Sequence, residues 1–297
     1  MINSPYVEDA DAEWYRGNLH THTEHSPDST RPVANVISDY EEREYDFLTL
    51  TDHDTFVDPA DYQERTTMSL ISGIEVTDNS THVIALNINS AITPDPDRQT
   101  VLDAVAEDDG IAVLPHPNWG PEFEHYSQEK LAELNGYAGI EVYNGASERG
   151  QGSSLATDHW DRLLSNGHVV WGYANDDSHR QNDVEKAWTV VQTTEFTPTA
   201  IISALKTGRC YASTGVTIEE ITVDSDTVSV QTTNAATIRL IADYGTVHRV
   251  VESATASFDV PGDLRPDVDP SYVRIECLGS GNRTAWTQPL FLDGRTE

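Results

Sequence analysis

The chain has 297 residues, of which 50 are acidic and 18 are Lys or Arg, and its formal net charge at pH 7 is -32. This length allows a sizeable core and about two domains. So strong a negative charge repels phosphate backbones and anionic membrane surfaces. We therefore expect neither nucleic acid as an obligate partner nor a membrane, and an anionic substrate would need local positive charge, such as bound metal ions.

The acidic residues are spread along the whole chain, and the only lysines are Lys130, Lys186 and Lys206. A carboxylate-rich surface with few lysines is expected of a protein that stays soluble at very high salt, where charge repulsion is screened. The composition therefore predicts a halophilic protein.

Cysteine usage and the N-terminal residues indicate the cellular compartment. Cys210 and Cys277 lie far apart and outside any metal-ligand spacing, so we expect free thiols. Residues 1–14 contain neither a basic nor an apolar segment, and no apolar run reaches the roughly eighteen residues of a membrane span. These features predict a cytoplasmic protein and leave its oligomeric state open.

In residues 17–195, short apolar runs alternate with segments of helical periodicity. Strands are expected at residues 17–22, 46–51, 69–77, 82–88, 110–116, 139–144, 169–175 and 187–193. Helices are expected at residues 31–45, 98–110, 154–167 and 197–208, the last three ending at a glycine. Repeated strand-then-helix units predict parallel strands covered by helices, in a sheet that is open or closed into a barrel.

After residue 212 the pattern changes to short alternating segments separated by turn residues. They lie at residues 216–225, 227–233, 236–245, 246–253, 254–262, 271–279 and 284–292. This pattern predicts a small antiparallel β-sandwich. We therefore expect two domains, residues 1–211 and 212–297, and the second could shape the mouth of a pocket or pair subunits.

Candidate metal ligands stand at the ends of the expected α/β strands. His20 and His22 are two residues apart, so on a strand they project from one face, and Asp28 follows in the loop. The other candidates are His53, Glu75, His82, His116, Asp177 and His179. All but one of the strands that carry a candidate have it at the carboxyl end, which is the active-site rim of α/β folds.

So many imidazoles and carboxylates on one rim would repel one another or pair poorly. Divalent metals remove that cost, because imidazole suits zinc, iron or manganese and carboxylates can bridge two ions about 3.5–4 Å apart. The pattern therefore predicts a multinuclear metal site.

The ordered motifs HxH, TDHD, GIE, a histidine opening the next strand, PHP and DxH resemble the PHP (polymerase and histidinol phosphatase) family of metal-dependent phosphoesterases. The resemblance covers about residues 17–195. It implies a distorted (β/α)7 barrel of PHP type with a trinuclear metal site. A shorter segment, residues 200–215, resembles the CehA/McbA branch of this family, which includes hydrolases of carbamate esters.

The resemblance also implies how the ligands divide among three metals. The first metal would be held by His20, His22, Glu75 and Asp177; the second by Glu75, His82 and His116; the third by Asp28, His53 and His179. Catalysis is then expected to depend on His20, His22, Glu75, His116, Asp177 and His179.

Other residues near these motifs could support the site or bind substrate. His25 could face substrate or lie in a surface loop, and Asp52 or Asp54 could orient a ligand by accepting an imidazole N–H. Glu141 and Asn144 could support the ligands or cap the next helix. Trp119 could line the pocket or pack in its loop. Arg149 and Arg180 could hold an anionic leaving group or form exposed salt bridges.

The leading hypothesis is a metal-dependent hydrolase that cleaves a small anionic phosphate ester with hydroxide held between two metals. One alternative is a carbamate or carboxylic ester hydrolase of CehA/McbA type, and another is a non-catalytic metal-binding module. His125, His159, His168 and His248 match no motif and are expected to be surface or core residues.

Overall fold

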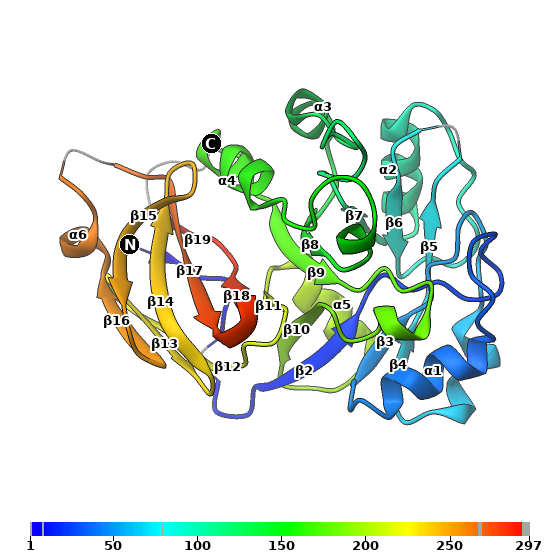
Figure 1. Cartoon of the computed structure of the whole chain (residues 1–297), viewed down its shortest axis with the longest axis horizontal. Helices are drawn as coiled ribbons and strands as arrows, with labels where there is room; N and C mark the ends of the chain where they lie inside the picture. Colours follow the sequence, from blue (N-terminus) through cyan, green and yellow to red (C-terminus); the bar gives the residue numbers. More distant parts are fainter. Residues whose placement is uncertain (1, 8, 79, 267–268, 293–297) are drawn as a thin grey trace.

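The computed structural model describes residues 2–7, 9–78, 80–266 and 269–292. An α/β part contains most of the helices, and a strand-rich part contains the last third of the chain (Figure 1). The helices of the α/β part are α1 (Val33–Glu41), α2 (Arg98–Glu107), α3 (Gln128–Glu133), α4 (Thr157–Ser165) and α5 (Pro198–Lys206). Its strands are β2 (Glu13–Asn18), β3 (Phe47–Thr49), β4 (Ser69–Ile71), β5 (Gly73–Val76), β6 (Val83–Leu86), β7 (Ile111–Leu114), β8 (Gly139–Asn144), β9 (Trp171–Asn175), β10 (Trp188–Thr193) and β11 (Cys210–Ser213).

The strand-rich part is almost entirely antiparallel. Its elements are β12 (Ile218–Asp224), β13 (Thr227–Thr232), β14 (Ala235–Ala242), β15 (Thr246–Val251), β16 (Thr255–Asp259), the short helix α6 (Val260–Asp263), β17 (Tyr272–Gly279), β18 (Thr284–Thr287) and β19 (Leu290–Leu292), and β1 (Ile2–Asn3) pairs with β19. Every segment that the sequence predicted here forms a strand, and the last one is split by Pro289. Side chains of β12 and β13 pack against those of β14 and β17 in one buried cluster.

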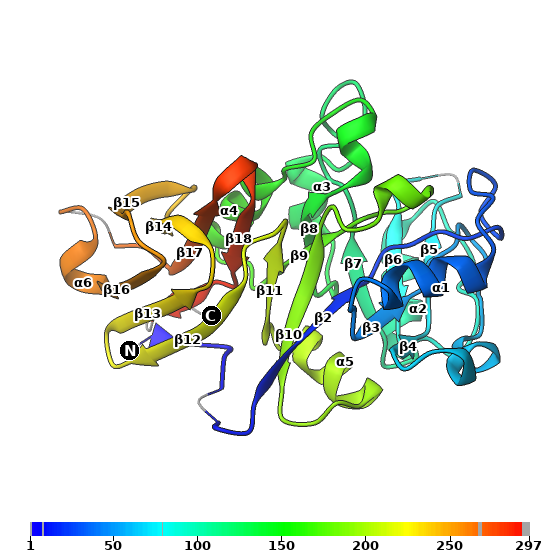
Figure 2. The ribbon, with the colours of Figure 1, turned by 60° about the horizontal axis from the view of Figure 1, so that its bottom comes forward.

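Among the described residues the strands form three sheets. The largest has the order β1-β19-β17-β18-β11-β10-β2-β3-β4, with β14 and β15 attached beside β17; the others are β5-β6-β7-β8-β9 and β12-β13-β16. Figure 2 shows β11, β10 and β2 running between the two parts of the molecule. Because β11 pairs with β18, the two parts share backbone hydrogen bonds as well as side-chain packing.

The expected α/β class is confirmed, but the expectation of parallel strands holds only in part. β2, β3 and β4 pair in parallel, as do β7, β8 and β9, whereas β6 pairs antiparallel with both β5 and β7. The link between Val76 and Val83 is too short for the helical crossover that a parallel pair needs, so β5 and β6 must turn back on each other.

The strand pairings of the described residues do not close into a barrel. The two sheets of the α/β part approach each other at single parallel bridges, Thr21 with Ser178 and His53 with Glu75. Thr21, His53 and Ser178 follow β2, β3 and β9 and have left the regular ladder, whereas Glu75 lies within β5. A closed ring of (β/α)7 pairing is therefore not formed, although the open edges meet beside the predicted metal ligands.

Helix positions follow the sequence signals closely. The face of α1 that is buried consists of Val33, Val36, Ile37 and Tyr40, as its periodicity predicted. The side chain of Thr197 accepts a hydrogen bond from the N–H of Ala200 at the start of α5. The short helix α3 was not predicted, because its single buried residue, Leu131, gives no periodicity to detect. Among the described residues, no helix has both the length and the apolar character needed to cross a bilayer.

Candidate metal centre

The predicted ligands come from both sheets of the α/β part and meet between them. His20 and His22 follow β2, which ends at Asn18, earlier than the sequence predicted. His22 donates its backbone N–H to the Ser178 carbonyl, and Thr51 donates its N–H to the Thr21 carbonyl. The HxH segment is thereby held between the segments that carry Asp177 and His53.

Close packing of the strands places Glu75 at the centre of the site. Its strand lies so near β3 that a Cβ atom added to Gly73 would be 2.4 Å from the Thr49 methyl carbon. Only glycine permits this approach. The Glu75 carboxylate is 1% exposed, and its oxygens lie 2.9 Å from His82 Nδ1, 3.2 Å from His116 Nε2 and 2.8 Å from His53 Nδ1.

Hydrogen bonds at Nδ1 fix the tautomers of three predicted ligands. His20 Nδ1 lies 2.9 Å from Glu141 Oε1, His22 Nδ1 lies 2.9 Å from Ser26 Oγ, and His179 Nδ1 lies 3.0 Å from the Asp177 carbonyl. Because the carboxylate and carbonyl oxygens are acceptors, the Nδ1 atoms of His20 and His179 carry the protons. Ser26 donates its hydroxyl to Asp52, so it accepts from His22 in the same way. In its neutral form, each ring then presents an unprotonated Nε2 to the site.

The positions of these Nε2 atoms suit binding to a cation better than hydrogen bonding to one another. His20 Nε2, His22 Nε2 and His179 Nε2 are all buried without a hydrogen-bond partner among the described residues, although Asp177 Oδ1 lies 3.3 Å and 3.1 Å from the first two. Glu75 Oε2 is also buried and unsatisfied. Lone pairs facing carboxylates across such distances are repulsive unless a proton or a metal ion lies between them.

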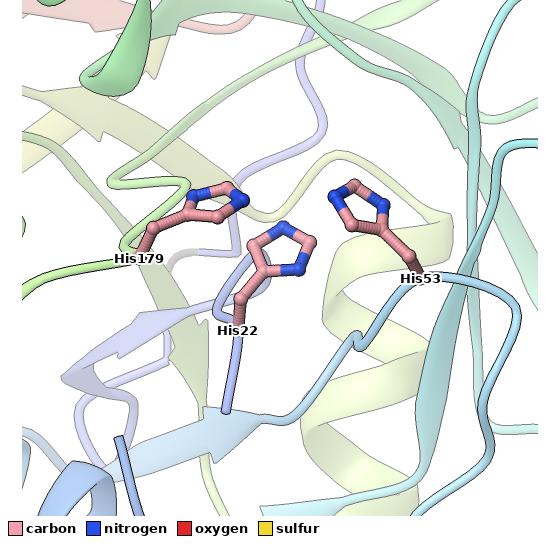
Figure 3. A group of neighbouring side chains, drawn as sticks. All are labelled: His22, His53 and His179. Carbon is pink, nitrogen blue, oxygen red and sulfur yellow. The ribbon is translucent and has the colours of Figure 1, made fainter. Parts of the chain in front are cut away.

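Several of these residues form groups whose ligand atoms lie within 4.8 Å of one another. The groups are His20, His22 and Glu75; His20, His116 and Asp177; His22, His53 and His179; and His82, His116 and His125. Figure 3 shows the rings of His22, His53 and His179 pointing toward one another from three separate segments. Asp28 lies next to the group shown in Figure 3, with its oxygens 3.0 Å from His179 Nε2 and 3.5 Å from His53 Nε2.

The electrostatics of the cluster keep its carboxylates ionised. Burial raises the pKa of Glu75, but His20, His82 and His116 outweigh it and hold that pKa well below its usual value. Burial also raises the pKa of Asp177, and His20 and His22 again outweigh it. Two ionised carboxylates in a buried ring of imidazoles form a donor set that suits divalent metals.

Glu141 and Asn144 both support the ligands, and Asn144 Oδ1 also accepts the backbone N–H of Ser147 in the turn after β8. The Glu141 carboxylate accepts hydrogen bonds from His20 Nδ1, the His116 backbone N–H, Asn144 Nδ2 and Asn175 Nδ2. Asn144 Nδ2 also donates to Asp177. The buried carboxylate therefore orients two predicted ligands and has no oxygen left over for substrate.

Asp52 acts through a residue that the sequence did not single out. It accepts hydrogen bonds from Thr23 and from the hydroxyl of Ser26, which in turn contacts His22. Ser26 lies on the loop after the HxH motif, where a serine carries no distinguishing signal. Asp54 instead accepts hydrogen bonds from Thr77 and fixes the loop after β5.

A cavity of about 270 Å³ opens onto the predicted ligands. Its lining comprises Asp28, His53, Glu75, His82, His116, Trp119, Ala146, Ser147, Arg149, Asp177, His179 and Arg180. Trp119, Arg149 and Arg180 are thus brought to the site. His25 is exposed and does not line this cavity, as the surface-loop interpretation expected.

His125 is the main residue that the sequence interpretation misplaced. It lies against the site, with its ring centroid 4.7 Å from those of both His82 and His116. Its Nε2 accepts the backbone N–H of His82, so in the neutral ring the proton is on Nδ1. His125 therefore supports the position of His82. It follows His116 by nine residues in an irregular loop, where no periodicity links the two.

Comparisons with known proteins give a fold but no close relative. No protein-family model matches the chain. An uncharacterized protein of Methanocaldococcus jannaschii is 22% identical over 154 residues, which are 48% of this chain and 88% of that protein. This identity is too low to transfer an activity.

Two solved structures are similar to this chain to different extents. A two-domain protein from Bacteroides vulgatus that contains a predicted PHP-like metal-dependent phosphoesterase has a TM-score of 0.55 and 18% identity, covering 97% of this chain and 90% of that one. A lesion-specific endonuclease from Pyrococcus furiosus has a TM-score of 0.49 and 14% identity, covering 65% of this chain and 56% of that one.

These comparisons do not confirm the CehA/McbA branch, and they do not support the exclusion of nucleic acid as a partner. The similarity to the Bacteroides vulgatus protein spans the α/β part and the strand-rich part together. The resemblance to PHP proteins that the ordered motifs indicated is therefore confirmed at the level of the fold.

Proposed function

We propose that the protein is a metal-dependent phosphoesterase of PHP type, in which the α/β part corresponds to the family's distorted barrel. The observation that carries this proposal is the set of buried Nε2 atoms of His20, His22 and His179. They lie next to ionised carboxylates and have no hydrogen-bond partner within the described part of the chain. A site that serves only to hold the fold together would leave few such atoms unsatisfied.

The residues of the cluster divide naturally among three cations. His20, His22, Glu75 and Asp177 would hold the first, Glu75 with His82 and His116 the second, and Asp28, His53 and His179 the third. Zinc, manganese and iron all suit this mixture of imidazole and carboxylate. When bound, such cations acidify water and neutralise charge on phosphoryl oxygens.

The chain's own groups would orient and shield the reaction. Glu141 orients the His20 ring and the His116 backbone through hydrogen bonds. Asp52 orients His22 through the hydroxyl of Ser26. These bonds fix each Nε2 lone pair toward the site before any ligand binds. Because Asp28 is about half exposed, the group with His53 and His179 lies nearest solvent.

The test is hydrolysis of p-nitrophenyl phosphate, bis-p-nitrophenyl phosphate and 1-naphthyl carbamate by protein loaded with zinc, manganese or iron. We expect the phosphate esters to be cleaved. His116→Ala should lower kcat/KM at least about a hundredfold, since even outer hydrogen-bond partners of ligands contribute about 10–100-fold. His168→Ala is the matched control, because His168 does not line the cavity.

The other outcomes of this assay distinguish the alternative functions. Cleavage of the carbamate alone would contradict the phosphoesterase and favour the ester hydrolase. Failure to cleave any of the three compounds with any metal would leave a metal-binding module.

A further inference from the structure

The cavity beside the predicted ligands is lined by two arginines in a protein with few basic residues. Arg149 and Arg180 both line it, although the whole chain has only 18 Lys and Arg against 50 Asp and Glu. An anionic molecule approaching this surface is repelled almost everywhere else. The two guanidinium groups therefore bring positive charge to a cavity whose carboxylates, Asp28, Glu75 and Asp177, are predicted metal ligands.

A buried carboxylate holds the arginine segments in place. Asp183 is 2% exposed, and its Oδ2 lies 2.8 Å from Arg149 Nη2 while accepting the backbone N–H groups of His179 and Arg180. Arg149 is thus tied to the segment that follows a predicted ligand. This arrangement prepares the rim before a substrate arrives, which lowers the ordering cost of binding.

The charge of Arg180 is not used within the described part of the chain. Its side chain is exposed, and no described carboxylate lies within ion-pair distance of its guanidinium group. Arg162, by contrast, lies 3.7 Å from Asp158 on α4. A guanidinium with free donors binds carboxylate or phosphate oxygens in pairs of parallel hydrogen bonds.

The size of the cavity limits which anionic molecules Arg180 could bind there. At about 270 Å³ it is smaller than the roughly 300–1,000 Å³ of sites for drug-sized ligands. The predicted metals would take up the charge of the reacting phosphoryl group, so Arg180 is available for charge elsewhere on a short molecule.

We propose that Arg180, with Arg149 lining the same cavity, selects small phosphate esters whose leaving group carries a second anionic group, a carboxylate or a phosphate. This inference rests on the proposed phosphoesterase function. It makes the arginines specificity-determining residues of the same site.

Binding and hydrolysis should be measured separately on metal-loaded protein. For binding, calorimetry would compare 3-phosphonopropionate and propane-1,3-bisphosphonate with propylphosphonate, which has a neutral tail. We expect one or both of the probes with an anionic tail to bind at least about tenfold more tightly than propylphosphonate, and the better of the two identifies the second anion as carboxylate or phosphate. Arg180→Gln should remove this preference, whereas the control Arg162→Gln should retain it.

For hydrolysis, kcat/KM would be compared for 2-phosphoglycolate, propane-1,3-diol bisphosphate and 2-hydroxyethyl phosphate. Arg180→Gln should lower it for the preferred anionic ester by about 10–100-fold, and by at least tenfold less for 2-hydroxyethyl phosphate. An equal loss for all three esters, or no loss for any, would overturn the inference and leave the phosphoesterase intact. A binding preference without hydrolysis would instead contradict the proposed function alone.

Discussion

At the scale of single residues, two predicted ligands sit on strained backbone. His116 and Asp177 have φ angles of 34° and 52°, a region that costs a non-glycine residue about 1–3 kcal/mol. Each lies two residues beyond the end of a strand. The His116 N–H donates to the Glu141 carboxylate, and the Asp177 N–H donates to the His20 carbonyl. The turns direct both side chains back over the strand ends. The strained backbone is therefore what brings these two predicted ligands to the site.

Replacement of Glu141 by glutamine should weaken metal binding. All four partners of the Glu141 carboxylate are donors, so the amide of Glu141→Gln would direct an N–H at another N–H. We expect affinity for zinc or manganese to fall about 10–100-fold. Competition with a chromogenic chelator measures this. Glu133→Gln, on the exposed side of α3, is the control, and equal affinities for both variants would refute the orienting role.

At the scale of elements, local signals predicted some features and could not predict others. The apolar face of α1 and the Thr197 cap of α5 are encoded within single helices, and both helices were predicted. The antiparallel pairing of β6 depends on neighbours chosen by the whole sheet, so alternation of strands and helices could not give it. The ladder from β11 to β18 joins segments about seventy residues apart and left no local trace.

A buried ion pair joins α4 to the strand-rich part. Asp161 accepts two hydrogen bonds from Arg274 at 2.8 and 2.7 Å and one from the Tyr272 hydroxyl, and Asp161 and Arg274 are 4% and 3% exposed. Asp161→Asn leaves the buried guanidinium without its counter-charge. We expect the free energy of unfolding to fall by about 3–5 kcal/mol in urea titrations.

The control for this prediction lies on the same helix. Asp158→Asn removes the charge of an exposed pair with Arg162 and should change stability by no more than about 1 kcal/mol. If both variants lost equal stability, the buried pair would not be what fastens α4 to β17.

At the scale of the whole molecule, repulsion between carboxylates affects both the acidic surface and the predicted metal site. A net charge of -32 disfavours the compact chain at low salt. The ordered motifs predicted which side chains meet, because their order along the strands fixes the rim of the fold. The residues behind them, Ser26 and His125, could not be predicted because they lie on irregular loops with ordinary spacing.

Salt should stabilise this protein. Raising KCl from about 0.1 M to above 1 M shortens the screening length from about 10 Å to about 3 Å and relieves repulsion among the surface carboxylates. The Tm from calorimetry should therefore rise steadily over this range. A Tm that stays level or falls would contradict the prediction of a halophilic protein.

The most direct test of the account is the metal content of protein purified without added metal, with activity on phosphate esters measured before and after chelation. The account predicts at least two tightly bound divalent cations per chain, because the imidazole and carboxylate groups form more than one compact ligand set. Chelation should abolish hydrolysis, and restoring the metal should recover it. Fewer than two cations per chain, or full activity after their removal, would contradict it.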